Sequence, residues 1–239
     1  MKKKAIILVN TDIEHENKRT FYSCDNRYID CISEAGATAL LVPCTASEEL
    51  LSRSLEFADG ILFTGGRDYP LECYNGKGCP ELNVMDVARS SSDIFLAKSV
   101  LSSRIPVLGI CAGVQLISIA NGGSLLCHIN NSEAHSGNVL HNVNIMDGTH
   151  LKGILGDKQV IEVVSSHHQA VSPDAPGLNM RISAFAHDGT VEAVETSEKE
   201  RFLLGLQWHP ERSVEKTDTM KIFNAFVAAA LEYAGRKRL

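Results

Sequence analysis

The first half of the chain alternates short apolar runs with amphipathic segments of helical period. The apolar runs are rich in β-branched residues and end at turn residues, which is typical of buried strands. Parallel strands need a long crossover between them, so this alternation favours a mainly parallel sheet with helices on both faces. The expected strands are Ala5–Asn10, Thr38–Val42, Asp59–Thr64 and Ile105–Ile110. The expected helices are Asn26–Ala35, Val84–Leu101, Ala112–Ala120 and a segment that is capped by Ser47 and ends at Phe57. Thr11–Asp25 is expected to be a polar loop.

The second half has a different pattern, in which short strand-like runs follow one another with turns between them. Asp147-Gly148 and Asp188-Gly189 suggest hairpins with short loops. We expect these strands to extend the same sheet, so that residues 1–239 form a single domain. The expected strands are Val139–Met146, Gln159–Val164, Asn179–Ala186, Val191–Thr196 and Phe202–Gln207, and a final helix is expected over Val214–Ala234.

Composition excludes several classes of protein. The 239 residues are 44% hydrophobic, which is enough apolar material for a packed core. The formal net charge of −6 argues against a nucleic-acid binder that relies on a basic face. No apolar run approaches the roughly 20 residues of a membrane span. The basic start, Lys2 to Lys4, precedes an apolar run of only Ala5–Val9, too short for a signal peptide, so a cytoplasmic protein is expected.

Cysteines and histidines give little sign of a metal site. The seven cysteines are odd in number and irregularly spaced, unlike a disulfide scaffold. Cys73 and Cys79 flank a Gly-rich loop without two further ligands nearby, so we interpret them as separate thiols or a redox pair. His167 and His168 are adjacent, and on a strand such neighbours point to opposite faces. The remaining histidines considered are expected on the surface or in ordinary packing: His128, His135, His141 and His150.

Gly109-Ile110-Cys111-Ala112-Gly113 lies where a predicted strand turns into a predicted helix. This is the form of a nucleophile elbow, in which a tight turn exposes the nucleophile and requires tiny neighbours. The helix N-terminus favours a thiolate at Cys111, and the Ala112 amide could stabilise an oxyanion. The alternative is a buried structural cysteine beside ordinary turn glycines.

A cysteine nucleophile needs a base, and the base needs an orienting group. His209 follows a predicted strand end, and Glu211 lies two residues further on, past Pro210. Gly65 and Gly66 end another parallel strand, where an amide of either could donate to an oxyanion. Each motif alone has an ordinary alternative. His209 could be a surface histidine beside a helix-capping Glu211, and Gly65-Gly66 could be a plain strand-to-loop turn.

Together these motifs resemble the class I glutamine amidotransferase superfamily, and within it the γ-glutamyl-γ-aminobutyrate hydrolase group. Order and spacing match over about Lys4 to Ala229. The motifs that carry the resemblance are TGG-x-D of Thr64–Asp68, PVLGICAGVQ of Pro106–Gln115, NGGSL of Asn121–Leu125, SSHHQAV of Ser165–Val171, DGTVEAVE of Asp188–Glu195 and GLQWHPE of Gly205–Glu211.

The resemblance implies a flavodoxin-like three-layer α/β sandwich, with a mainly parallel central sheet and additional antiparallel strands in the C-terminal half. It implies hydrolysis of a γ-glutamyl amide bond in a small γ-glutamyl amine or glutamine, through a γ-glutamyl thioester. No cofactor or metal is implied, and no nucleic-acid or membrane partner; the resemblance leaves room for a homodimer. The implied site residues are the triad Cys111, His209 and Glu211, the oxyanion-hole residues Gly65, Gly66 and Ala112, and the substrate-binding residues Gln115, His168 and Gln169.

Three departures from the group's pattern leave the substrate open. Ala112 stands where the group commonly has arginine, and Arg89-Ser90-Ser91-Ser92-Asp93 replaces an R-D-x-x-E stretch. The loop after Gly66 carries an insert between Cys73 and Cys79. Two other functions therefore stay open: a glutaminase subunit that supplies ammonia to a separate synthase, and a non-catalytic binder of glutamyl ligands.

Overall fold

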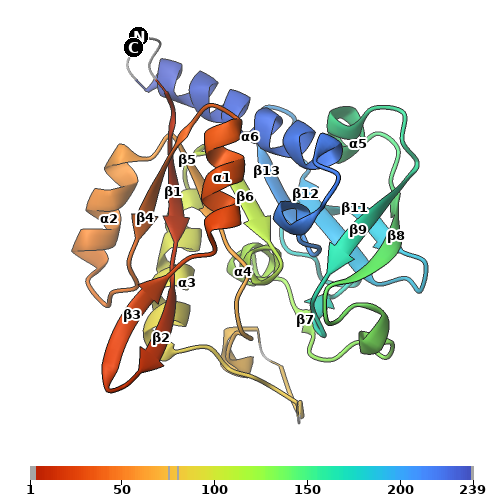
Figure 1. The fold of residues 1–239 in the computed structure, drawn as a ribbon, viewed down its shortest axis with the longest axis horizontal. Helices are drawn as coiled ribbons and strands as arrows, with labels where there is room; N and C mark the ends of the chain where they lie inside the picture. The colour runs from red at the N-terminus through yellow and green to blue at the C-terminus, as the bar shows by residue number, and fades with distance from the viewer. Residues whose placement is uncertain (1–3, 75, 80, 238–239) are drawn as a thin grey trace.

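In the computed structural model, which describes residues 4–74, 76–79 and 81–237, one large sheet runs through both halves of the chain (Figure 1). Lys2 and Lys3, of the basic start, lie outside the described residues. The strands are, from one edge of the sheet to the other, β4 (Thr38–Val42), β1 (Ile6–Asn10), β5 (Gly60–Phe63), β6 (Val107–Ile110), β13 (Leu203–Leu206), β12 (Val191–Thr196), β11 (Met180–Ala186), β8 (Val139–Ile145) and β9 (Val160–Ser165).

The sheet has a parallel part and an antiparallel part. Strands β4, β1, β5, β6 and β13 pair in parallel, in the strand order of a flavodoxin-like fold. Strands β12, β11, β8 and β9 continue the sheet in antiparallel pairs. The expected fold class, with its antiparallel C-terminal extension, is confirmed. In such sheets ligands bind outside the carboxyl ends of the strands, where the strand order reverses, here between β1 and β5.

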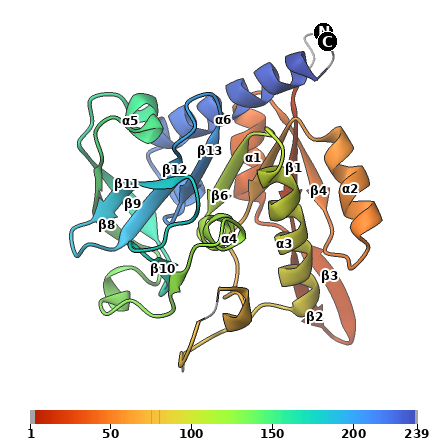
Figure 2. The same cartoon turned by 180° about the vertical axis from the view of Figure 1, so that it is seen from behind.

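Helices cover both faces of the sheet (Figures 1 and 2). One hydrophobic core lies between the sheet and α1 (Asn26–Glu34), α5 (His150–Leu155) and α6 (Thr217–Arg236). A second core lies between the opposite face and α2 (Glu48–Phe57), α3 (Val87–Leu101) and α4 (Ala112–Ala120). Strands β1, β5, β6 and β13 are buried almost throughout as a result, which explains their continuous apolar sequences, whereas the edge strand β4 is partly exposed.

Side-chain caps decide where several helices begin. The Ser47 hydroxyl accepts a hydrogen bond from the Leu50 amide at 3.3 Å, as expected for the start of α2. Asp86 caps α3 by accepting from the Ala88 amide at 2.8 Å. Helix α3 therefore begins at Val87, three residues after the expected start at Val84. Helix α6 has no side-chain cap and begins at Thr217, three residues after the expected start at Val214, which is fully exposed.

The two Asp-Gly turns of the second half have different outcomes. Asp188-Gly189 joins β11 to β12 as a hairpin, and Gly189 has a φ of 87°. Asp147-Gly148 does not join two strands directly, so that expectation was wrong. The chain enters the short helix α5 instead, because Thr149 caps it by accepting from the Lys152 amide at 3.1 Å.

The segment Thr11–Asp25 is a hairpin, so the expected loop was wrong. Strands β2 (Asp12–Glu16) and β3 (Arg19–Ser23) pair in antiparallel register. Asn17 and Lys18 form the turn with φ values of 49° and 62°, as a two-residue hairpin of type I′ requires. Further short elements are η1 (Leu71–Cys73), β7 (Leu125–Leu126), η2 (Ser132–Ala134), β10 (Ala170–Val171) and η3 (Pro210–Arg212).

Among the residues that the structure describes, no helix combines the length and apolarity needed to cross a membrane. All seven cysteines are free thiols.

Close backbone approach joins β5, β6 and α4 at the end of the sheet. A Cβ atom added at Gly113 would lie 2.2 Å from the carbonyl oxygen of Phe63. A Cβ atom added at Gly109 would lie 2.6 Å from the carbonyl oxygen of Gly113. Any larger residue at either position would push α4 away from the strands, because the clashes are with backbone atoms that cannot rotate aside.

We expect Gly113→Ala to destabilise the fold by at least about 1–3 kcal/mol, the cost of overpacking a filled core. Gly153→Ala is the matched control, since Gly153 lies in α5 with open space around its Cα. There alanine should stabilise the protein by about 0.5–1 kcal/mol through its higher helix propensity. Urea unfolding of both variants measures the difference, and equal effects of the two substitutions would contradict the packing argument.

Candidate active site

Cys111 occupies a strained turn between β6 and α4. Its φ is 53° and its ψ is −110°, a region that L-residues rarely adopt. Its amide donates to the Leu206 carbonyl of β13 at 2.8 Å, and its thiol lies 3.8 Å from the Ser166 carbonyl oxygen. The strand-to-helix turn expected from the glycine spacing is therefore present. It holds the sulfur at the carboxyl end of the parallel strands.

His209 lies directly beside this thiol. It follows β13 and precedes η3, and its amide donates to the Val164 carbonyl at 2.8 Å. The side chains of His209 and Cys111 both lie against Gly65, and both line one cavity. Glu211 Oε1 is 2.6 Å from Nδ1 of His209, and both side chains are buried. The structure thus brings together the cysteine, histidine and glutamate that the sequence predicts as a triad.

The imidazole of His209 is strongly perturbed by this environment. Burial alone would lower its pKa, but the charge and hydrogen bond of Cys111, followed by those of Glu211, raise the pKa to about 9. The histidine therefore favours its protonated form at neutral pH. A cationic imidazole held between two acidic groups can donate a proton to a leaving group and take one back later.

The turn Thr64–Gly66 faces the same thiol and is held from two sides. The Gly65 amide donates to the Tyr28 hydroxyl at 3.1 Å, so this amide is already engaged. On the other side, Arg89 donates to the Thr64 hydroxyl at 3.2 Å and to the Thr11 carbonyl at 2.7 Å. These contacts fix the backbone at the carboxyl end of β5, where the sequence predicts oxyanion donors.

Arg89 and Asp93 form a buried ion pair beneath this turn. They are one helical turn apart in α3, and the Arg89 side chain is only 1% exposed. Asp93 also accepts hydrogen bonds from the Tyr69 hydroxyl at 2.7 Å and from the Asn10 side-chain amide at 2.8 Å. The stretch Arg89–Asp93 departs from the group's R-D-x-x-E pattern. It supports the site through the ion pair between Arg89 and Asp93, which are four residues apart.

A polar cavity of about 370 Å³ opens at the thiol. It lies beyond the carboxyl ends of β1, β5, β6 and β13, as the strand order leads one to expect. Its walls carry both signs of charge, and they include residues of the β2–β3 hairpin. The charged lining residues are Asp12, Glu14, Asp25, Arg67 and Arg212.

The three predicted substrate-binding residues lie elsewhere. The side-chain amide of Gln115 is buried and donates to the Gln169 carbonyl at 3.4 Å and to the Gln207 side chain at 3.3 Å. His168 Nε2 is 3.1 Å from both carboxylate oxygens of Asp68. Gln115, His168 and Gln169 are not among the described residues that line the cavity, whereas Ser166 is.

Sequence reasoning missed the contribution of the hairpin to the cavity. Asp12, Glu14 and Ser23 line it, although the segment was expected to be a loop. A signal was present in the β-branched and aromatic residues on either side of Asn17, which are Ile13, Thr20, Phe21 and Tyr22. The turn has lysine where hairpins usually have glycine, which concealed it.

Comparison with known proteins agrees with this geometry. The family model described as Peptidase C26 matches residues 5–211. This chain belongs to the Peptidase C26 family.

Proteins that resemble this chain include a candidate amidotransferase and a hydrolase. A candidate glutamine amidotransferase from Mycobacterium tuberculosis is 33% identical over 218 residues, covering 88% of this chain and 68% of its own. A γ-glutamyl-γ-aminobutyrate hydrolase from Escherichia coli K12 is 29% identical over 227 residues. The match covers 89% of this chain and 88% of the hydrolase. The predicted resemblance to class I glutamine amidotransferases is confirmed.

A solved structure supports the fold. It is a candidate GMP synthase subunit from Thermoplasma acidophilum, with a TM-score of 0.69 and 18% identity. The match covers 99% of this chain and 100% of the other. At 18% identity, the similarity shows a shared fold and carries no information about the substrate.

We expect Asp93→Ala to destabilise the protein by about 3–5 kcal/mol, because it removes the nearest carboxylate from the buried Arg89 guanidinium and leaves Asp12, at 3.7 Å, as its carboxylate neighbour. Glu56→Ala is the control, since Glu56 pairs with Arg53 at 3.4 Å on the exposed face of α2. That loss should change the free energy of unfolding by no more than about 0.5 kcal/mol. Both values come from urea unfolding, and a small effect of Asp93→Ala would show that the buried pair does not support this region.

We expect Cys111→Ala to lower the pKa of His209 from about 9 toward its ordinary range, because Cys111 makes the largest contribution that raises it. An NMR titration of the His209 ring protons measures this pKa. Cys73→Ala removes a half-buried thiol away from the cavity and should leave the pKa unchanged. An unaltered His209 pKa in Cys111→Ala would mean that thiol and imidazole do not interact.

Proposed function

We propose that this protein is a cysteine-dependent hydrolase of γ-glutamyl amide bonds, acting on a small γ-glutamyl amine or on glutamine. The observation that carries the proposal is the position of His209, between the Cys111 thiol and the Glu211 carboxylate. Nucleophile, base and orienting group lie in the order that acyl transfer requires. Membership of the Peptidase C26 family supports the reaction class.

The first half of the reaction forms a thioester. The Cys111 thiolate attacks the γ-carbonyl carbon, and the carbonyl oxygen becomes an oxyanion. We assign its stabilisation to the amides of Gly66 and Ala112, because the Gly65 amide is engaged by Tyr28; each such donor is worth roughly 3 kcal/mol. His209 donates its proton to the nitrogen as the carbon–nitrogen bond breaks, and the amine leaves.

The second half releases glutamate. The neutral His209 takes a proton from water, and the resulting hydroxide attacks the thioester carbon. The carbon–sulfur bond breaks, glutamate leaves, and the thiolate and imidazolium are restored. Glu211 stabilises the cationic imidazole in both halves, through its 2.6 Å contact with Nδ1 of His209.

The mixed charge of the cavity supports a γ-glutamyl head group. Such a group carries an α-ammonium and an α-carboxylate, so its recognition needs acidic and basic side chains together. Arg67 and Arg212 can face the carboxylate, and Asp12 and Glu14 can face the ammonium. Arg67 is held toward the hairpin by a 2.8 Å hydrogen bond to the Ile13 carbonyl.

We expect the purified protein to release free glutamate from at least one member of a panel of γ-glutamyl amines and glutamine. Cys111→Ala should lower kcat by about 10⁴-fold or more, since no other group replaces the nucleophile. Cys73→Ala should retain full activity. Glutamate is measured over time for each substrate.

The alternatives give different results in this assay. Hydrolysis of glutamine only, and only after addition of a synthase, would favour the glutaminase subunit. Binding of γ-glutamyl compounds without turnover would favour the non-catalytic binder. Full activity of Cys111→Ala would overturn the proposed nucleophile.

A further inference from the structure

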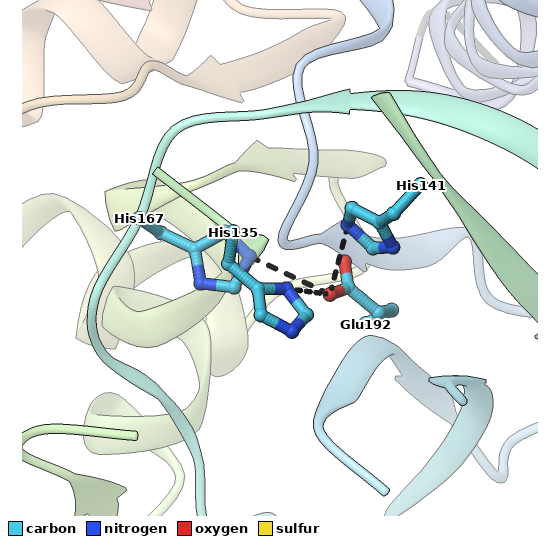
Figure 3. A group of neighbouring side chains, drawn as sticks. All are labelled: His135, His141, His167 and Glu192. Atoms are coloured by element: carbon cyan, nitrogen blue, oxygen red, sulfur yellow. Dashed lines mark ion pairs between the residues drawn. The ribbon is translucent and has the colours of Figure 1, made fainter. Parts of the chain in front are cut away.

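Three imidazoles surround one carboxylate in the antiparallel half of the molecule (Figure 3). His135 follows η2, His141 lies in β8, His167 follows β9 and Glu192 lies in β12. One ligand atom from each of the four lies within 4.8 Å of all the others. His135 and His141 were expected on the surface or in ordinary packing, but the fold gathers them with His167. We call these four residues the His3Glu cluster.

The distances in the His3Glu cluster suit a tetrahedral metal ion. Glu192 Oε1 is 3.1 Å from His135 Nδ1, 3.5 Å from His141 Nε2 and 3.5 Å from His167 Nε2. Zinc bonds to nitrogen and oxygen are about 2.0–2.2 Å, so tetrahedral ligands lie about 3.4 Å apart. The carboxylate oxygen and each imidazole nitrogen are already close to that separation. The imidazole nitrogens lie within 4.8 Å of one another, and ligation would bring them closer together.

The outward nitrogens of two rings are held by acceptors. His135 Nε2 is 3.0 Å from the Asp188 carboxylate, and His167 Nδ1 is 2.9 Å from the Gln169 carbonyl. A ring nitrogen beside an acceptor carries the proton, so the inward nitrogen of a neutral ring presents a lone pair. Histidines that bind metal have this arrangement, in which a carboxylate or carbonyl orients the ring.

His141 has the same orientation. Its Nδ1 is 3.3 Å from the Asn142 carbonyl, and its inward Nε2 is 2.7 Å from the Ser165 hydroxyl, which can donate to a lone pair. Each of the three rings therefore turns one nitrogen toward Glu192 and has an acceptor at the other, which is the orientation that a metal ligand needs.

The charge of the His3Glu cluster calls for a cation. Glu192 is fully buried, and within the described residues neither of its carboxylate oxygens has a partner in hydrogen-bonding geometry. The same holds for His135 Nδ1 and His167 Nε2. A buried carboxylate needs a compensating positive charge nearby, which either a protonated His135 or a bound cation supplies. A dication at the centre would offset both the Glu192 charge and the nearby charge of Asp188.

A path to solvent is present. His135, His141 and Asp188 line a surface cavity of about 390 Å³ on the outer side of the His3Glu cluster. An ion can therefore enter the folded protein and be removed by a chelator.

We propose that His135, His141, His167 and Glu192 bind one zinc ion. Three imidazoles and one carboxylate form a donor set that zinc prefers, and four protein ligands make a closed, structural site. This inference does not depend on the hydrolase activity. The ion would fasten strands β8 and β12 to the two loops that carry His135 and His167.

The loop fastened by His167 also reaches the candidate active site. Ser166, the preceding residue, lines the cavity there and has its carbonyl 3.8 Å from the Cys111 thiol. The His167 amide donates to the His135 carbonyl at 2.8 Å, so the two loops are already joined through their backbones. Zinc would add side-chain bonds to this junction and hold the wall of the cavity.

Zinc binding is tested on the full-length protein, stripped with a chelator and titrated with zinc chloride against a chromophoric competitor. We expect one zinc per chain and a rise in Tm of about 5–10 °C at zinc concentrations 100-fold above the dissociation constant. His141→Gln removes the most accessible ligand and should weaken binding by about 100-fold or more. His150→Gln, at the start of α5 and outside the cluster, should bind as the wild type does.

Two further measurements separate this site from others. Asp188→Asn should weaken zinc binding by about 10- to 100-fold, as expected for a group that orients a ligand. Cobalt chloride should give the visible bands of tetrahedral coordination without a thiolate charge-transfer band, and Cys111→Ala should retain full stoichiometry. Far-ultraviolet circular dichroism checks that each variant is folded.

The proposal is overturned if the stripped wild type binds no stoichiometric zinc, or if folded His141→Gln binds it as tightly as His150→Gln does. A thiolate band with cobalt would also overturn it, because that band would place the metal on a cysteine. None of these results would bear on the glutamate-release assay, so the two proposals fail separately.

Discussion

The candidate site depends on the close packing of β5, β6 and α4 at the carboxyl end of the sheet. Cys111 can hold its positive φ only because Gly109 and Gly113 let the helix begin directly against the strands. A strained residue costs of order 1–3 kcal/mol and persists only where its surroundings fix it. Here the surroundings are backbone atoms of two parallel strands, so the position of the sulfur follows from the fold itself.

Much of the parallel half could be predicted from sequence, because its inner strands are buried and have continuous apolar runs. The positions of the three candidate triad residues could be predicted too, because they follow strand ends and have distinctive neighbours. The start of α3 and the hairpin at Asn17 were harder to predict. In the first case a capping side chain, Asp86, decides the boundary, and in the second a turn forms without its usual glycine.

The His3Glu cluster could not have been predicted by spacing alone. Its members come from residues 135 to 192 and share no local motif, since β8 and β12 become near neighbours only through the order of the antiparallel strands. His167 and His168 follow β9 and have different partners: His167 belongs to the His3Glu cluster, and His168 contacts Asp68. The sequence does not say which distant side chains His167 will meet.

Strands β6 and β13 are direct neighbours in the sheet, with Ile110 opposite Leu206. Cys111 follows one strand and His209 follows the other, so the ladder of main-chain hydrogen bonds sets the separation of the proposed nucleophile and base. The length of chain between them has no influence on that separation. Homologous proteins could therefore acquire insertions, or whole appended domains, between α4 and β13 and keep these two side chains in register.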